Sequence, residues 1–300
     1  MKFDLSPYRH ITLRPVTGAL GAEVTDIDCT GALAESTGEE LRRALGQFHV
    51  LFFRDQQLDD DGLLRLAEVF GPPATSPLNG PESARQPISR LVREADAPAA
   101  ERNFGDRWHM DRGGDPTPPL GFLLCCEEAP EYGGDTLFAS LSAAYDALPD
   151  HVRQRLAGLT GVHSMSRLFG LDERSARTQS LLDEPSRPAP FTEQKHFDYV
   201  RSEAEHPLVC RHPLNGRPYL FVTGSYFLRV KGLPQAESDA LVDALNHHVT
   251  RPDFTCRFRW RKDSIAILDN RCTLHFAAND YAGFARRMRR IELGSDWVPQ

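Results

Sequence analysis

Two histidines and one aspartate have the residue types and the spacing of a metal site. His109 and Asp111 are separated by one residue, and His275 follows much later in the chain. If the first two lie on a strand, the two-residue repeat of the backbone points both side chains to one face. Two histidines and one carboxylate that leave further positions open are the ligand set of non-haem Fe(II) oxygenases. The triad therefore predicts an iron enzyme.

An arginine-rich segment follows the last of these histidines. Strand alternation would place Arg286, Met288 and Arg290 on one face, and Arg287 and Arg289 on the other. A guanidinium group can bind a carboxylate through two parallel hydrogen bonds, and a buried arginine without an anion is very costly. We therefore expect the first face to hold two carboxylates, one of them from a 2-oxo acid that is consumed together with dioxygen. The alternative is an exposed basic strand.

The remaining histidines are expected to have structural roles. The chain has 11 histidines, so a pair such as His109 and Asp111 can arise by chance. His247 and His248 lie in a helical pattern and are expected at the surface, while His212 is expected to end a strand. None of the others shows the spacing of a metal ligand.

Composition narrows the class of protein. The 300 residues carry a net charge of −7, which argues against a nucleic-acid or anionic-membrane surface. No apolar run approaches the roughly 20 residues that span a bilayer, and the first residues lack the apolar region of a signal peptide. The 6 cysteines show no CxxC pairing and are expected as buried thiols in a reducing compartment. These features predict a soluble cytoplasmic protein.

The elements that must position the triad are mostly short strands. Strand patterns cover 11–16, 22–27, 49–53, 120–126, 136–139, 208–211, 219–222, 254–260, 265–268 and 288–293, and helical patterns cover 39–48, 60–70, 142–156 and 235–249. Many short strands with few helices predict an all-β core with flanking helices (α+β), arranged as a double-stranded β-helix or jelly roll. Ser36 and Thr37 are expected to cap the first helix, and His275 is expected on a loop after a strand.

Two long stretches without a clear pattern, at about 74–107 and 167–206, are too long for passive connectors. We expect them to form lids over the site. No linker divides the chain, so residues 1–300 are expected to form one domain.

Several motifs occur in an order that is highly specific. Residues 108–111 read WHMD, residues 133–136 read GGDT, and residues 269–275 read DNRCTLH, while GAEV at 21–24 and VLFFRDQ at 50–56 precede them. Nearly end to end, the chain resembles the Fe(II)/2-oxoglutarate-dependent dioxygenases of the TauD/TfdA type.

The resemblance implies a role for each residue that matches a family motif. It implies His109, Asp111 and His275 as Fe(II) ligands, Arg286 and Thr136 as partners of the distal carboxylate of 2-oxoglutarate, and Arg290 as the partner of the substrate's anionic group. It also implies O2 as co-substrate and a homo-oligomer, a dimer or higher.

The chain departs from the taurine-type members around the substrate. Ser76 and Asn79 stand where those members carry a histidine and a tyrosine, and Gly105 replaces an asparagine. Arg112, Gly113 and Gly114 follow the ligand aspartate where those members carry a small residue, a threonine and an aromatic. Arg112 should add positive charge, and loss of the aromatic should widen the pocket. Ser76, Asn79, Arg112 and Arg290 are therefore the expected substrate contacts. We expect a larger organic acid, amino acid or secondary-metabolite intermediate instead of taurine.

The expected reaction is oxidation of an aliphatic C–H bond in a small carboxylate-bearing or otherwise anionic substrate, most simply hydroxylation, with release of succinate and CO2. A carboxylate at Asp111 favours this over halogenation, because a small residue there would leave room for a halide. Desaturation or cyclisation in a biosynthetic pathway is the alternative with the same cofactor. A non-oxidative metal-dependent barrel enzyme and a small-acid-binding protein are the alternatives without it.

Overall fold

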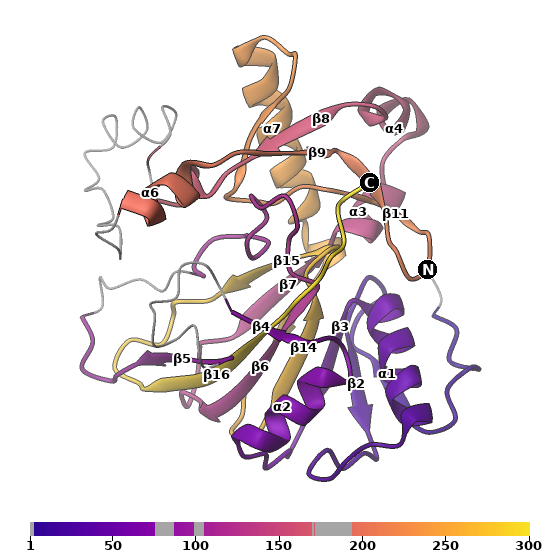
Figure 1. The fold of residues 1–300 in the computed structure, drawn as a ribbon, viewed down its shortest axis with the longest axis vertical. Coiled ribbons are helices and arrows are strands. Elements are labelled where there is room, and N and C mark those ends of the chain that lie inside the picture. The colour runs from indigo at the N-terminus through magenta and orange to yellow at the C-terminus, as the bar shows by residue number, and fades with distance from the viewer. Residues whose placement is uncertain (1–2, 76–86, 99–104, 170, 172–193) are drawn as a thin grey trace.

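The protein is seen in a computed structural model that describes residues 3–75, 87–98, 105–169, 171 and 194–300. Within these residues, eight strands form the main sheet (Figure 1). Their order is β1 (Thr12–Pro15), β2 (Ala22–Thr25), β3 (Val50–Phe53), β14 (Ile265–Asp269), β6 (Gly121–Glu128), β16 (Arg286–Leu293) and β4 (Pro73–Ala74), with β5 (Ile88–Arg93) also paired to β16. Apart from β2 and β3, neighbouring strands are antiparallel.

A second sheet faces the inner side of the main sheet. It consists of β13 (Thr255–Phe258), β7 (Thr136–Ser140) and β15 (Thr273–Ala277), in that order. Phe52 of the main sheet stacks on Phe258 of the second sheet, with ring centroids 4.1 Å apart. These rings belong to an apolar core between the two sheets, which is the packing of a jelly roll. The predicted all-β core with flanking helices is confirmed.

Two helices cover the outer side of the main sheet. These are α1 (Glu35–Phe48) and α2 (Asp60–Glu68), which lie beside β2, β3 and β14 in Figure 1. Ile267 of β14 packs in the core beneath the helices, whereas its neighbour Leu268 packs in the core between the sheets. Both faces of β14 are therefore buried, which explains its continuous apolar sequence.

The remaining elements complete the end of the jelly roll that carries the site. They are the helices α3 (Leu141–Asp146), α4 (Asp150–Leu156), α6 (Gln194–Arg201) and α7 (Gln235–Val249), the 3₁₀ turns η2 (Met165–Arg167) and η3 (Pro252–Phe254), the sheet β12 (Phe227–Val230), β8 (Thr160–His163) and β9 (Ala204–Pro207), and the hairpin β10 (Val209–Arg211) and β11 (Pro218–Leu220).

Two helix predictions were wrong. The pattern at 142–156 forms two helices, α3 and α4, because Pro149 lies between them as the N-cap of α4 and a proline inside a helix removes a backbone hydrogen bond. Helix α1 begins at Glu35, so Ser36 and Thr37 lie inside its first turn, and its N-cap residue Ala34 makes no side-chain cap hydrogen bond.

The two predicted lids contain more regular structure than their sequences indicate. β5 lies in the first stretch and pairs with β16 over six positions, while α6 and most of β9 lie in the second. Residues 76–86, 99–104, 170 and 172–193 are outside the described part of the chain. The single domain, the homo-oligomer and the cytoplasmic location stay predictions.

Two expectations from composition can be compared with the structure. All six cysteines are buried and free, as predicted. Among the described residues, no helix combines the length and the apolar character needed to cross a bilayer.

Candidate active site

The two histidines of the triad lie opposite each other. The backbone N–H of His109 donates to the carbonyl of His275 (3.1 Å), the N–H of His275 donates back (2.9 Å), and the ring centroids are 4.0 Å apart. His275 lies within β15, so its predicted place on a loop was wrong. His109 also bridges to Gly224, which has φ of +63°, and a Cβ there would lie 2.1 Å from the Trp108 carbonyl oxygen. Only glycine fits this approach.

Asp111 completes the cluster. Its Oδ1 lies 3.3 Å from His109 Nε2 and its Oδ2 lies 3.7 Å from His275 Nε2, so the predicted triad is brought together. Asn270 holds the aspartate's backbone from both sides: its Oδ1 accepts from the Asp111 N–H and its Nδ2 donates to the Asp111 carbonyl, each at 2.9 Å. The Asp-Asn-Arg motif thus supports the triad from the neighbouring turn.

The protonation states of the triad suit a cation. His109 Nδ1 donates to the Arg107 carbonyl (2.7 Å), so Nε2 is the nitrogen that faces Asp111. Burial lowers the pKa of His109, but the hydrogen bond and the charge of Asp111 outweigh burial and raise it, so a bound metal would take the place of the Nε2 proton. Burial, together with neighbouring His109, lowers the pKa of His275 to about 3. Burial opposes ionisation of Asp111, but Arg290 and the two histidines outweigh it and hold the pKa of Asp111 below its usual range. Neutral imidazoles and an ionised carboxylate are the forms that bind a divalent metal.

Arg286 is a buried cation without an acidic partner. It is 8% exposed, its Nε donates to the Gly134 carbonyl (3.1 Å), and its guanidinium lies 6.0 Å from the Trp260 ring centroid. Within the described residues, no carboxylate lies at ion-pair distance from it. Burial lowers the pKa of Arg286. Because an unpaired buried charge is costly, a ligand carboxylate is the natural completion of this site.

Thr136 and Trp260 stand beside this arginine subsite. Trp260 Nε1 donates to Thr136 Oγ1 at 2.9 Å, and both side chains are buried. The indole nitrogen only donates, so the threonine keeps its own hydroxyl proton for another acceptor. Arg286 and Thr136 can therefore both donate to one carboxylate. The sequence placed Trp260 at the end of a strand pattern, and only the tertiary contacts reveal its role.

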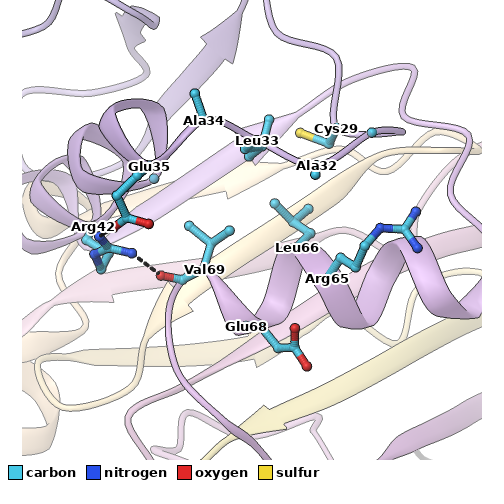
Figure 2. Close-up of a pocket in the computed structure, with 12 residues that line it drawn as sticks. Cys29, Ala32, Leu33, Ala34, Glu35, Arg42, Arg65, Leu66, Glu68 and Val69 are labelled. Atoms are coloured by element: carbon cyan, nitrogen blue, oxygen red, sulfur yellow. Dashed lines mark hydrogen bonds and ion pairs between the residues drawn. The ribbon is translucent and has the colours of Figure 1, made fainter.

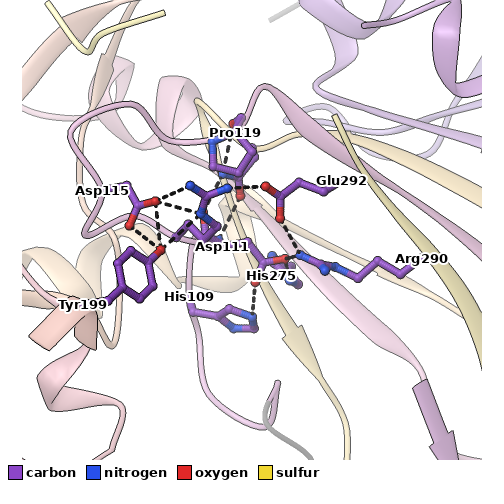
Figure 3. A network of polar contacts seen from close by, with 10 residues as sticks. His109, Asp111, Asp115, Pro119, Tyr199, His275, Arg290 and Glu292 are labelled. Carbon is purple, nitrogen blue, oxygen red and sulfur yellow. Dashed lines mark hydrogen bonds and ion pairs between the residues drawn. The ribbon is translucent and has the colours of Figure 1, made fainter. Parts of the chain in front are cut away.

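Arg290 lies on the triad side of β16. Its Nη2 is 3.2 Å from Asp111 Oδ2 and 3.7 Å from Glu292 Oε2 (Figure 3). Its guanidinium covers the Phe122 ring at 3.9 Å. Met288 packs between the two sheets, whereas Arg289 pairs with Asp60 of α2 on the opposite face. The predicted alternation of the arginine-rich strand is thus confirmed.

Arg112 is already paired inside the protein. Its Nε donates to Asp115 Oδ2 at 2.7 Å, and its Nη1 donates to Glu292 Oε1. Two carboxylates balance its charge, which speaks against the predicted role of Arg112 in binding an anionic substrate. A Cβ at Gly113 would lie 2.7 Å from Thr223 Cγ2, and one at Gly114 would lie 2.9 Å from Ser164 Cα, so both glycines are closely packed. The wider substrate pocket expected from the missing aromatic at Gly114 stays a prediction.

The other two predicted substrate contacts, Ser76 and Asn79, lie outside the described residues. The sequence missed Asp115, Tyr199 and Glu292, which join Arg112 and Arg290 in one polar network (Figure 3). No motif marked them, because each is an ordinary polar residue until the fold places it near the triad.

A separate cavity of about 320 Å³ lies between α1 and α2 (Figure 2). Its two arginines already donate to backbone carbonyls, Arg42 to Val69 and Arg65 to Thr30. This cavity contains none of the triad residues and does not belong to the site.

Comparison with known proteins agrees with this geometry. The sequence profile of the family described as "Taurine catabolism dioxygenase TauD, TfdA family" matches residues 12–291. An alkylsulfatase of Acinetobacter baylyi is 33% identical over 295 residues, 98% of this chain and 88% of that protein. An alpha-ketoglutarate-dependent sulfate ester dioxygenase of Pseudomonas putida is 32% identical over 290 residues, 95% of this chain and 90% of that protein.

Solved structures share the fold. A taurine dioxygenase from Burkholderia xenovorans superposes with a TM-score of 0.76 at 30% identity, over 97% of this chain and 93% of that one.

Proposed function

The chain belongs to the taurine catabolism dioxygenase TauD, TfdA family, and within that family we propose that it oxidises an aliphatic C–H bond of a small anionic organic substrate. It is a dioxygenase that depends on Fe(II), 2-oxoglutarate and O2. We assign His109, Asp111 and His275 to the metal. We assign Arg286 and Thr136 to the distal carboxylate of 2-oxoglutarate.

The observation that carries this proposal is the inner face of β16. Arg286 at one end is buried without a carboxylate partner, and Arg290 at the other end lies beside the triad. The two guanidinium groups therefore suit two anions on either side of the metal: the co-substrate at Arg286 and the substrate at Arg290.

The protein's residues bind and orient the reactants. When bound, Fe(II), 2-oxoglutarate and O2 supply the oxidant that removes hydrogen from a C–H bond, with succinate and CO2 as by-products. Arg290 would fix the anionic end of the substrate, and the Phe122 ring beneath it limits how far the guanidinium can swing. Trp260 and Thr136 would shield the co-substrate carboxylate from water.

As the substrate class we propose alkyl sulfate monoesters. The similar proteins named above act on sulfate esters by their names, and a single arginine beside a metal suits a singly charged group better than a dianion. Oxidation at the carbon that carries the ester oxygen gives an unstable product, which releases sulfate and leaves an aldehyde. Sulfate release is therefore a direct readout.

A panel of three probes with the same six-carbon chain, together with taurine, tests the proposal. Hexyl sulfate, hexanesulfonate and hexanoate would each be incubated with enzyme, Fe(II), 2-oxoglutarate and O2, and succinate, sulfate and the organic products measured. We expect turnover of hexyl sulfate, with one succinate per sulfate, and no turnover of taurine. If the enzyme forms succinate but none of the six-carbon probes accelerates this, the proposed substrate class is rejected and the cofactor assignment is kept.

Product masses separate the competing outcomes. Hydroxylation adds one oxygen, whereas desaturation or ring closure removes two hydrogens. These two outcomes remain alternatives within the same chemistry. Family membership decides against a non-oxidative barrel enzyme and against a protein that only binds small acids.

A further inference from the structure

A series of polar and charged side chains connects helix α6 to the triad. On α6, the Tyr199 hydroxyl lies 2.7 and 2.9 Å from the two carboxylate oxygens of Asp115. Asp115 pairs with Arg112, and Arg112 donates through Nη1 to Glu292. Figure 3 labels Tyr199, Asp115 and Glu292. Each of these hydrogen bonds involves a charged group, and such hydrogen bonds are stronger than those between neutral groups.

Glu292 joins this chain to Arg290. The glutamate is 3% exposed, and its Oε1 accepts from Arg112, while no described residue donates a hydrogen bond to its Oε2. That oxygen lies 3.7 Å from Arg290 Nη2. Arg290 is thus held between two carboxylates, Asp111 at 3.2 Å and Glu292. Once a metal takes up the charge of Asp111, Glu292 is the acidic group left to orient the arginine from the protein side.

Helix α6 also packs against the segment around η2. Val200 packs with Met165 and Phe169 of the segment around η2, and its carbonyl accepts from Ser164 Oγ at 3.0 Å. From this helix, the side chain of Tyr199 contacts Asp115 (Figure 3). The position of α6 and the position of Arg112 are therefore linked through Asp115.

We propose that Tyr199, Asp115, Arg112 and Glu292 form a positioning relay, through which the docking of helix α6 sets the orientation of Arg290 toward the anionic group of the substrate. The inference rests on the proposed role of Arg290 in binding that group. Thermodynamic linkage requires the reverse effect as well: an anion bound at Arg290 stabilises the docked position of α6. Tyr199 and Glu292 are then positioning residues for specificity, not catalytic ones.

Hydrogen exchange of the α6 amides tests the relay. The enzyme would be loaded with Fe(II) and 2-oxoglutarate without O2, and exchange over 194–201 measured with and without hexyl sulfate. In the wild type we expect slower exchange when the probe is present. Tyr199→Phe and Glu292→Gln should each speed exchange about tenfold without the probe and abolish the response to it, since each removes one hydrogen bond to a charged group.

The double variant and a control make the result decisive. In a relay the second substitution adds little to the first, so the double variant should match either single variant in both exchange and probe affinity. Glu203→Gln removes an exposed carboxylate close to the end of α6 that pairs with Arg229 outside the relay, and it should behave as the wild type. The visible band of the Fe(II)–2-oxoglutarate complex, retained in every variant, shows that the site is intact.

Two results would point elsewhere. If Tyr199→Phe loosens α6 but Glu292→Gln leaves its exchange unchanged, Tyr199 is a local structural contact and the relay is rejected. If hexyl sulfate does not bind the wild type, while Glu292→Gln still loosens α6, the proposed substrate class fails and the relay stands.

Discussion

The described residues contain two clusters of histidine and aspartate, and both bring three possible metal ligands within 4.8 Å of one another. One is the triad of His109, Asp111 and His275. The other combines His212 and Asp269 with Cys272 beneath the Asp-Asn-Arg turn. Distances and residue types alone do not separate the two clusters.

The difference lies in how their polar atoms are satisfied. In the second cluster, Asp269 accepts from His212 Nε2 at 2.8 Å and from the guanidinium of Arg271 through both Nε and Nη2. Burial raises the pKa of the Cys272 thiol well above its usual value, which keeps it protonated. A metal ion there would have to displace Arg271. In the triad, the Nε2 atoms of the two histidines face the Asp111 carboxylate at 3.3 and 3.7 Å. Arg290 donates to that carboxylate at 3.2 Å, and the described residues place no guanidinium between the three ligands.

From this difference we infer that the first cluster serves metal chemistry and the second serves stability. The second cluster lies where β14 ends, and the Asp269 N–H donates to the carbonyl of His49, the C-cap residue of α1. It thereby joins the main sheet to the helix and to the turn at His212. Substitutions in the two clusters should separate metal binding from folding.

The largest effect is expected from His275→Ala. Loss of a group that only orients a metal ligand typically lowers metal affinity or activity by roughly 10- to 100-fold. Removing one of the three ligands themselves should lower Fe(II) affinity and turnover by more than that. Anaerobic titration with Fe(II), followed by the visible band with 2-oxoglutarate, measures it. His212→Ala is the matched control, and equal loss of iron binding in both variants would refute the division into two roles.

Asp269→Asn should destabilise the fold most. It leaves Arg271 buried without its counter-ion, which typically costs about 3–5 kcal/mol. Urea unfolding of the apo-protein measures this. Asp253→Asn breaks the exposed pair with Arg251 and should cost at most about 1 kcal/mol. A loss for Asp269→Asn no greater than for the control would mean that the second cluster contributes little to stability.

Arg286→Lys sharpens the assignment of the co-substrate subsite. Lysine keeps the charge but not the planar fork, so we expect the KM for 2-oxoglutarate to rise about 10- to 100-fold, the value of one to two charge-assisted hydrogen bonds. The KM for hexyl sulfate should hardly change. Arg290→Lys should show the opposite pattern, and the same pattern in both variants would contradict the two-anion reading of β16.

The smallest effect concerns pH and the second cluster. Burial lowers the pKa of His49 to about 3, below its ordinary value of 6.5. The folded state favours the neutral form of His49. The contribution of this residue to the free energy of unfolding is therefore fully present above pH 6.5 and declines as the pH falls from 6.5 toward 3. The slope cannot exceed about 1.4 kcal/mol per pH unit for one proton.

His49→Asn tests this slope. Asparagine accepts the left-handed backbone of this position, where φ is +64°. The stability of the variant, measured by urea unfolding from pH 7 to pH 4, should depend less steeply on pH than that of the wild type. His247→Asn, on the exposed face of α7, is the control and should keep the wild-type slope.

Some elements could be predicted and others could not. Helix α7 was predicted with its observed bounds, and the period-two pattern of the arginine-rich strand gave the two faces of β16. β8, β9, β12 and β5 were missed, because short, partly exposed strands are recognisable only through their partners. Arg112 looked like a free cation because one partner, Glu292, is 180 residues away in sequence, and the other, Asp115, lies three residues on in a segment without a helical pattern.

The sequence by itself determined the chemistry: the ligand types, their order and the two arginines of one strand follow from local pattern and motif. Only the tertiary structure decided which polar groups are already satisfied. It paired Arg112 with Asp115 and Glu292, left Arg286 without an acid within the described residues, and brought Tyr199 of α6 to the network. The physical reason is that the charge balance of a buried group depends on neighbours from separate elements, and burial makes that balance decisive.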